Sequence, residues 1–425
     1  MLTEINSENS GIAETNAPAQ LRVKILGVGS GATATVSQLA FGGYPLERIV
    51  LDTSATDLTH APANANTKKF LFGEAVTHGL GAGTNSAVGE KSARSSETEL
   101  REILAGTDLL FIVAMLGRGT GSGAAPFIAE LARELGITTI SFATTPFSYE
   151  GKEIIAQAMN AAEKLHAASN AFVLVENDLV SQASADLGCN DGFKLSGSWI
   201  EKGVEACCAM LFSENAGARI DFGTFKSVFP LCGTPTLFAL GNGRGETAVN
   251  DALNEIFHCP FLNTRSAAAH SDTLVIHLRA GSEPTISVAN EISQRIRGRF
   301  GGNDRTLTCT TIVPELGNAL EICILGAGEI RRTRRKLNKV VSATSDSVPN
   351  IFADALANED EIPATHADAE SPLTQGELFD DPNRGVFQAQ RARLYDGQDL
   401  DSPTYIRRQC NLQKILDQKR RELQR

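Results

Sequence analysis

The chain has 425 residues, a formal net charge of −11 and an apolar content of 42%. This length allows two domains with cores of their own, and no apolar run approaches the roughly 20 residues that span a bilayer. The acidic balance argues against a nucleic-acid-binding body, because phosphate contacts need a basic surface. We therefore expect a chain that neither spans a membrane nor binds nucleic acid.

The N-terminus and the cysteines give no targeting or metal signal. Residues 1–20 are polar and acidic, without the basic and apolar blocks of a signal peptide, so we expect a disordered arm and no export. The eight cysteines form no C-x-x-C pair and have no histidine at ligand spacing. This predicts neither a zinc site nor a disulfide framework, and most thiols are expected to be buried in a reducing compartment.

Strand and helix patterns alternate from Leu21 onward. The strand-like runs are 21–29, 47–53, 107–116, 137–145 and 170–178. Helix-length stretches such as 96–106 and 126–136 lie between them. Strands separated by helices predict an α/β fold with a parallel sheet covered on both faces, and we assign residues 21–188 to this first domain.

A long helix and a second domain follow. Trp199, Val204, Cys208 and Leu211 recur at helical spacing, which predicts a central helix region over 189–214. Beyond it, the strand-like runs are 272–281, 306–314 and 319–328, with the helix-like run 287–300 between the first two. These runs predict a smaller α/β domain over 215–328.

The composition changes sharply after Gly328. Pro, Ser, Ala, Asp and Glu dominate as far as Asp399, and such a segment cannot bury enough apolar surface to offset chain entropy. We predict a disordered linker over 329–399. It leads into residues 400–425, an apolar and aromatic motif with a basic tail, which is the kind of tethered peptide that a partner binds.

The stretch from Gly117 to Gly123 carries the strongest chemical signal. Four of its seven residues are glycines and two bear hydroxyls, and it lies between a buried-strand pattern and a helix pattern with Pro126 near the start. Such a loop lets backbone N–H groups converge on an anion at a helix N-terminus. A flexible linker is the alternative, but linkers seldom lie directly between two regular elements. We interpret the stretch as phosphate-binding.

Two further glycine-rich turns lie at or near strand ends. Residues 27–32, G-V-G-S-G-A, with Asp52 after the next strand, fit a dinucleotide fingerprint and would bind NAD. That interpretation leaves both 117–123 and the turn 79–85 unexplained. Three such turns at one sheet edge predict a nucleoside triphosphate held by backbone amides, because the chain has no G-x-x-x-x-G-K-[ST] motif.

These motifs resemble those of the FtsZ family, the bacterial homologues of tubulin. The matching segments, in the family's order and spacing, are GVGSGATATV, LDTSATDL, GLGAGTNSAVG, MLGRGTGSGAAP, TTPFSYEGKE and END. The resemblance resumes at 218–228 and at 401–411. It implies a tubulin/FtsZ-type GTPase domain, a long central helix and a smaller C-terminal domain. It also implies a cytoplasmic cell division protein at the division site, which forms head-to-tail filaments of the division ring with GTP between subunits.

The resemblance also implies ligands and site residues. The expected ligands are GTP and GDP, with Mg²⁺. The α- and β-phosphates would meet Gly29, Ser30 and Gly31, and the γ-phosphate Gly81, Ala82 and Gly83. The phosphate tail would meet Gly117, Arg118, Gly119, Thr120, Gly121, Ser122 and Gly123. Glu150 would contact the ribose, with Asn177 and Asp178 nearby. Alternatively, these glycines only form turns, and Glu150 or Asp178 is a surface acid or helix cap.

Three positions near the expected nucleotide depart from the family pattern. Ala34 stands where the family has an asparagine, and Ile154 where it has an arginine beside the ribose. Arg118 stands where the family prefers glycine, so it adds a side chain and a positive charge beside the phosphates.

The positions that read the base also differ. Counted without gaps from Asn177, Lys194 and Ser198 fall where the family's central helix gives a phenylalanine and an asparagine to guanine. A shift of a few residues gives these roles to Asn190 or Phe193. Loss of one base-reading amide relaxes guanine preference by about ten- to a hundredfold.

Residues 218–228 resemble the family's synergy loop, whose carboxylates polarise the water that attacks the γ-phosphate of the neighbouring subunit. The family pattern N-x-D-x-x-D is replaced here by Arg219, Asp221 and Thr224 at its three fixed positions. Asp221 is therefore the expected catalytic residue, and we expect slow turnover. The alternative for Asp221 is a helix cap or a surface acid.

Residues 401–411 are similar to the family's C-terminal peptide. The resemblance implies that membrane-tethering division proteins dock on Pro403, Tyr405, Ile406, Arg407 and Arg408. A solvated amphipathic stub is the alternative.

Three functions remain open from the sequence. The first is an FtsZ-like GTPase that polymerises, the second is a nucleotide-binding but largely non-hydrolytic scaffold filament, and the third is an NAD-dependent oxidoreductase. The third rests only on residues 27–32 and Asp52, and the second domain offers it no catalytic constellation.

Overall fold

The computed structural model describes residues 21–62, 66–181, 188–212, 216–218, 220–263, 268, 270–329, 394–395 and 398–399. The predicted N-terminal arm 1–20, Arg219 and the tail peptide 400–425 with its five proposed docking residues lie outside this description, as does most of the predicted linker. The chain divides into two units, Met1–Ser345 and Asp346–Arg425. In the second unit, the described residues are the short antiparallel strands β12 (Leu394–Tyr395) and β13 (Gln398–Asp399).

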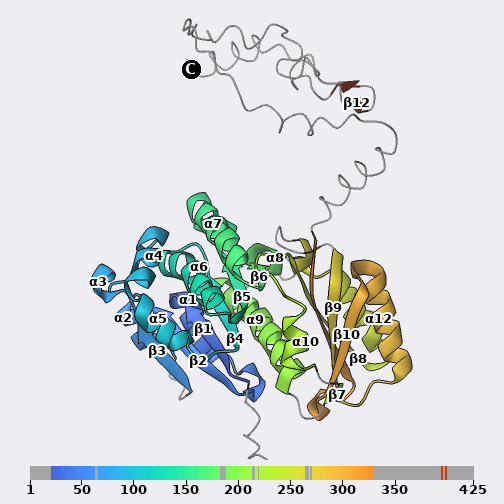
Figure 1. Ribbon diagram of the computed structural model, residues 1–425. Coiled ribbons are helices and arrows are strands. Elements are labelled where there is room, and N and C mark those ends of the chain that lie inside the picture. The colour runs from blue at the N-terminus through green and yellow to red at the C-terminus, as the bar shows by residue number, and fades with distance from the viewer. Residues whose placement is uncertain are drawn as a thin grey trace, which may run out of the picture. The chain divides into compact units, whose positions relative to one another are not determined.

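A six-stranded parallel sheet forms the first half of the larger unit (Figure 1). Its strands are β1 (Val23–Val28), β2 (Leu46–Asp52), β3 (Thr67–Leu71), β4 (Leu109–Met115), β5 (Thr138–Thr145) and β6 (Ala171–Glu176). The order is β3-β2-β1-β4-β5-β6, so the order in which strands are added reverses between β1 and β4, which pair in parallel. In doubly wound sheets, ligands bind outside the carboxyl ends of the strands at such a reversal. The predicted α/β fold class is confirmed, and β3 is a strand that the sequence did not indicate.

Helices cover both faces of this sheet. They are α1 (Ser30–Gln38), α2 (Ala55–His60), α3 (Glu74–Thr77), α4 (Ser86–Ser95), α5 (Glu97–Leu104), α6 (Gly119–Glu134), α7 (Lys152–Ala168) and α8 (Asn177–Ser181), with the 3-10 turns η1 (Phe41–Gly43) and η2 (Ser148–Glu150). Alternate residues along the strands point to opposite faces of the sheet and belong to two separate hydrophobic cores. Leu26 and Ile112 pack with residues of α5, α6 and α7, whereas Ile25 and Phe111 pack with α1 and the long helix described next.

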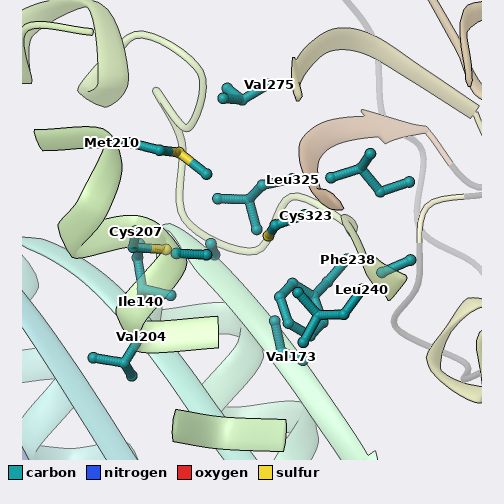
Figure 2. Packing of buried hydrophobic residues seen from close by; sticks show 14 of the residues in the cluster. Ile140, Val173, Val204, Cys207, Met210, Phe238, Leu240, Val275, Cys323 and Leu325 are labelled. Carbon is teal, nitrogen blue, oxygen red and sulfur yellow. The ribbon is translucent and has the colours of Figure 1, made fainter. Parts of the chain in front are cut away.

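Helix α9 (Cys189–Phe212) joins the two halves of the larger unit. Figure 2 shows Val204, Cys207 and Met210 of α9 in one cluster with side chains of the first sheet, such as Ile140, and of the second, such as Leu325. These α9 side chains are at most 1% exposed. A single core therefore runs through α9 and ties the second domain to the first.

The second domain contains a mixed five-stranded sheet of order β7-β10-β9-β11-β8. Its strands are β7 (Ala216–Ala218), β8 (Thr236–Arg244), β9 (His270–Ala280), β10 (Gly301–Ile312) and β11 (Ala319–Glu329). The remaining elements are α10 (Phe222–Lys226), α11 (Ala248–Phe257), α12 (Ile286–Phe300), η3 (Gly245–Thr247), η4 (Pro260–Asn263) and η5 (Pro314–Leu316). The only parallel pair in this sheet among the described residues is β9 with β10, and α12 crosses between these two strands.

The described cysteines are free thiols, and most lie in this shared core. Burial raises the pKa of Cys207 to about 12. A thiol with such a pKa carries almost no thiolate at neutral pH, so Cys207 acts as a packing residue. No helix in the described part of the chain has the length and apolar character to cross a bilayer.

Gly203 of α9 offers a test of this packing. A Cβ at Gly203 would lie 2.7 Å from Cε1 of Phe142 and 3.1 Å from Cζ of Phe238, whereas a Cβ at Gly298 of α12 would meet open space. Alanine favours a helix over glycine by about 1 kcal/mol, so Gly298→Ala is expected to raise the urea midpoint of unfolding. Gly203→Ala carries the same propensity gain but overpacks the core, and we expect it to lower the midpoint. Equal shifts in the two variants would contradict the packing described here.

Candidate functional site

A cleft of about 850 Å³ opens at the carboxyl edge of the first sheet. Turns after five of the six strands contribute to its lining: those after β1, β2, β4, β5 and β6, joined by the turn 80–84 and by the start of α9. This is the position that the strand reversal between β1 and β4 predicts for a ligand. The three glycine-rich turns of the sequence thus meet around one cavity.

Most of the predicted nucleotide residues line this cleft. They are Gly29, Ser30, Gly31, Gly81, Ala82, Gly83, Arg118, Thr120, Gly121, Glu150 and Asn177. Gly117, Gly119, Ser122, Gly123 and Asp178 are not among the lining residues. Asp178 instead accepts a hydrogen bond from the backbone N–H of Ser148 at 3.1 Å.

The Gly117 to Gly123 stretch is more helical than the sequence indicated. Helix α6 begins at Gly119, so the last three glycines of the stretch lie in its first turns and are buried, and Pro126 lies inside the helix. A Cβ at Gly119 would lie 2.6 Å from the carbonyl oxygen of Ala82, so this glycine permits a close backbone contact. Gly117 keeps a turn conformation with φ of 109°. The N-terminus of a 16-residue helix therefore faces the cleft, which favours an anion there.

Thr53, which the sequence did not single out, connects these turns. Its hydroxyl lies 2.7 Å from that of Thr120 and accepts the backbone N–H of Ala82 at 3.1 Å. The N–H of Gly81 donates to the carbonyl oxygen of Thr53 at 3.0 Å. Thr53 follows β2 directly, so one residue at a strand end holds the turns 79–85 and 117–123 to the sheet.

Two carboxyl groups lie beside the first glycine-rich turn. Asp52 is fully buried, and its Oδ1 accepts the backbone N–H of Thr53 at 2.7 Å and that of Ser54 at 3.2 Å. In the described part of the chain, its Oδ2 has no hydrogen-bond partner. Burial raises the pKa of Asp52 above its ordinary value, and the nearby charge of Asp57 adds to the shift. The exposed Asp57 accepts a hydrogen bond from the hydroxyl of Ser30.

The opposite end of the cleft is lined by α1 and α9. Phe193, Lys194 and Gly197 line it, whereas Ser198 does not and donates its hydroxyl to the carbonyl oxygen of Leu195 at 2.7 Å. Phe193 and Lys194 both line this end, and Phe193 is the aromatic side chain there. This is the residue that the shifted register assigns to the base. The Asn190 side chain lies outside the described part of the chain.

Asn177 and Glu150 line the cleft and Ile154 does not, and all three contact neighbouring residues of the chain. Asn177 is buried and accepts the hydroxyl proton of Ser196 at 2.7 Å. Glu150 accepts the backbone N–H of Phe147 at 2.9 Å, so its carboxylate partly serves its own turn. Ile154 packs against Gly117, where a Cβ would lie 2.7 Å from its Cγ2.

Asp221 lies away from the cleft and caps α10. Its Oδ1 accepts the backbone N–H of Thr224 at 2.9 Å, and its Oδ2 accepts the hydroxyl proton of the same residue. These hydrogen bonds lower the pKa of Asp221, which remains exposed. The cap alternative from the sequence is therefore present, and the carboxylate is also open to a second molecule.

A model of the tubulin/FtsZ family GTPase domain matches residues 41–184. The cell division protein FtsZ of Aquifex aeolicus is 30% identical over 307 residues, which make up 72% of this chain and 82% of that protein. The chain belongs to the tubulin/FtsZ family. The resemblance predicted from the motifs is confirmed, and the family is one of GTPases that bind GTP and GDP.

Solved structures of the family share the fold. The empty FtsZ dimer of M. jannaschii has a TM-score of 0.66 at 24% identity, covering 73% of this chain and 88% of that one. CetZ2 of Haloferax volcanii, in a GTPγS-bound protofilament, has a TM-score of 0.58 at 18% identity, covering 76% of this chain and 98% of that one. At these identities the likeness extends to the fold.

Asp52 generates a prediction about pH and stability. Its folded pKa lies above the unfolded value near 3.8, so the cost of ionising it sets in as the pH rises past that value and is complete above the folded pKa. Asp52→Asn removes this cost and keeps an oxygen for the two backbone N–H groups. We expect the variant to be more stable than the parent at pH 8, by on the order of 1 kcal/mol, and to lose this advantage near pH 4. Urea unfolding of both chains across this range measures the difference, and a pH-independent difference would contradict it.

Proposed function

We propose that this protein binds GTP in the cleft at the carboxyl edge of the first sheet and polymerises head to tail into filaments of the cell division machinery. The observation that carries the proposal is the convergence of three glycine-rich turns and the α6 N-terminus on one cavity of about 850 Å³. Backbone N–H groups and a helix N-terminus are suited to a polyphosphate. The GTPase family membership supports guanosine as the nucleoside.

Each glycine-rich turn is assigned to a part of the triphosphate. Gly29, Ser30 and Gly31 meet the α- and β-phosphates, the turn of Gly81 to Gly83 meets the γ-phosphate, and residues 117–123 meet the phosphate tail. Close packing explains the buried glycines of α6, so within 117–123 we assign direct contact to Arg118, Thr120 and Gly121, which line the cleft. Gly117, Gly119, Ser122 and Gly123 then shape the turn that presents them.

The ribose and base lie between α1 and α9 in this proposal. Glu150 and Asn177 flank the ribose, and Phe193 stacks on the base. Ala34 and Gly197 line this end and carry no polar group to read a base edge, which supports a relaxed preference for guanine. Asp178 acts on the Ser148 turn rather than on the ligand.

Mg²⁺ accompanies GTP in this proposal and is held mainly by the phosphates. The described residues contain no group of three or more His, Cys, Asp or Glu side chains that could bind a metal ion. Asp57 is the exposed carboxylate in the cleft lining, and carboxylate oxygen suits Mg²⁺. The ion supplies charge neutralisation on the phosphates.

Hydrolysis requires a second copy of the chain. Asp221 does not line the cleft of its own chain, and it follows the C-terminal end of α9, whereas Phe193 near the N-terminal end of α9 lines the cleft. A helix of 24 residues is about 36 Å long, so Asp221 can reach only the nucleotide of a neighbouring subunit. Its lowered pKa makes it a weak base, which supports slow turnover.

A second candidate function, a role for the tail and a competing cellular function accompany the proposal. The cap bonds of Asp221 also favour the second candidate, a filament that binds nucleotide and hydrolyses it hardly at all. Through Pro403, Tyr405, Ile406, Arg407 and Arg408, the tail would bind membrane-tethering proteins at the division site in the cytoplasm. The fold likeness to CetZ2 leaves a cytoskeletal role other than division as the competing cellular function.

A pelleting assay with GTP, GDP, ATP, NAD or no nucleotide tests the main proposal. We expect polymers with GTP and not with GDP, together with slow release of phosphate measured in the same samples. Polymers without release would support the scaffold candidate. Binding of NAD without polymers would instead support the oxidoreductase alternative and refute the proposal.

The catalytic role proposed for Asp221 can be tested separately from its role as the N-cap of α10. Asparagine is as good an N-cap as aspartate, so Asp221→Asn keeps the hydrogen bond to the Thr224 backbone and removes the charge. We expect unchanged thermal stability and GTP-dependent pelleting, with phosphate release reduced at least tenfold, because general bases contribute about 10²–10⁴ in rate. Parental release in this variant would remove Asp221 from the catalytic machinery.

A further inference from the structure

Gln157 links two of the glycine-rich turns through one side chain. It lies on α7, and its Nε2 donates to the carbonyl oxygens of Thr84 and Gly117, each at 2.8 Å. Its Oε1 accepts the backbone N–H of Ser86 at a longer 3.4 Å. The carboxamide thus contacts the turn that ends at Asn85 on one side and the turn before α6 on the other.

Both turns contain a glycine in the left-handed region of φ. Gly83 and Gly117 have positive φ values of 57° and 109°, so the backbone at these positions lies outside regular structure. One direct bond joins the two turns, from the N–H of Gly119 to the carbonyl oxygen of Gly83 at 2.8 Å. Thr53 bridges the same turns from the end of β2, and Gln157 adds a connection from α7.

The chemistry of the contact is specific to an amide. Both strong bonds use the two N–H groups of the same nitrogen and two carbonyl oxygens. A glutamate of the same shape has no donor to offer and would set a negative charge against the two carbonyl oxygens. The side chain is half-buried and borders a polar crevice of about 170 Å³, so its substitution leaves the apolar core intact.

We propose that Gln157 is a positioning residue that holds the 79–85 turn against the 117–123 turn and thereby sets the preference for a nucleoside triphosphate over a diphosphate. The inference rests on the proposed function, in which the 79–85 turn meets the γ-phosphate and the 117–123 turn meets the phosphate tail. A ligand without a γ-phosphate uses the 117–123 turn but not the 79–85 turn. Loosening the connection therefore weakens triphosphate binding more than diphosphate binding.

Fluorescence titration with mant-GTP and mant-GDP tests the inference on the full chain. The variants are Gln157→Glu, which keeps the shape, and Gln157→Ala, with Asn160→Ala as the matched control. Asn160 lies on the next turn of α7, borders the same crevice and, among the described residues, makes no hydrogen bond to either turn. We expect the ratio of the GDP and GTP dissociation constants to fall about tenfold in both Gln157 variants and to stay unchanged in the control.

The outcomes separate this inference from the function on which it rests. If the parent chain binds neither nucleotide, the proposed function fails and the inference fails with it. If the parent binds both and Gln157→Glu leaves the ratio unchanged, or weakens both ligands equally, then Gln157 does not act on the γ-phosphate turn and only this inference is overturned. Melting temperatures of all four chains show whether any loss of binding reflects unfolding.

Discussion

The close approach of α4 and α6 is the constraint on which the cleft depends. A Cβ at Gly89 would lie 2.1 Å from the carbonyl oxygen of Gly119, and a Cβ at Gly123 would lie 2.1 Å from that of Ser86. No side chain fits at these distances, so the two helix backbones meet only because both residues are glycines. This contact sets the N-terminus of α6 beside the turn 79–85. Two of the three turns assigned to the phosphates thus form one wall of the cleft.

Charges of both signs line the cleft. The α6 N-terminus and the exposed Arg118 attract an anion, whereas Asp52 and Asp57, after β2, repel it. Burial is the main reason why the pKa of Asp52 is raised, and the charge of Asp57 adds to it. A polyphosphate is most stable in such a site when a cation offsets the acidic side.

The sequence predicted the glycine-rich turns of the cleft better than it predicted the elements that hold these turns in place. Glycine-rich turns after apolar strands are visible in the sequence because positive φ values and close backbone contacts need glycine. The start of α6 at Gly119 was not visible, because glycine disfavours helices and only packing against α4 overrides that preference. Strand β3 carries Lys68 and Lys69 at the sheet edge and so lacks an apolar pattern. Gln157 occupies a polar position on an amphipathic helix, where nothing in the sequence distinguishes a ligand-turn support from a solvated residue.

Helix α9 connects one end of the cleft with the second sheet. Near its start, a Cβ at Gly197 would lie 3.3 Å from Cγ2 of Thr35, so α9 lies against α1 where both line the cleft. Farther along, Glu205 lies 3.7 Å from Arg279 of β9, which also pairs with Glu321 of β11 at 2.9 Å. Because the core around Val204 is close-packed, α9 cannot shift at one end without moving the second sheet. Phe193 lines the cleft near the start of α9, so a displacement of this end of the helix also moves the second sheet, which packs on the same helix.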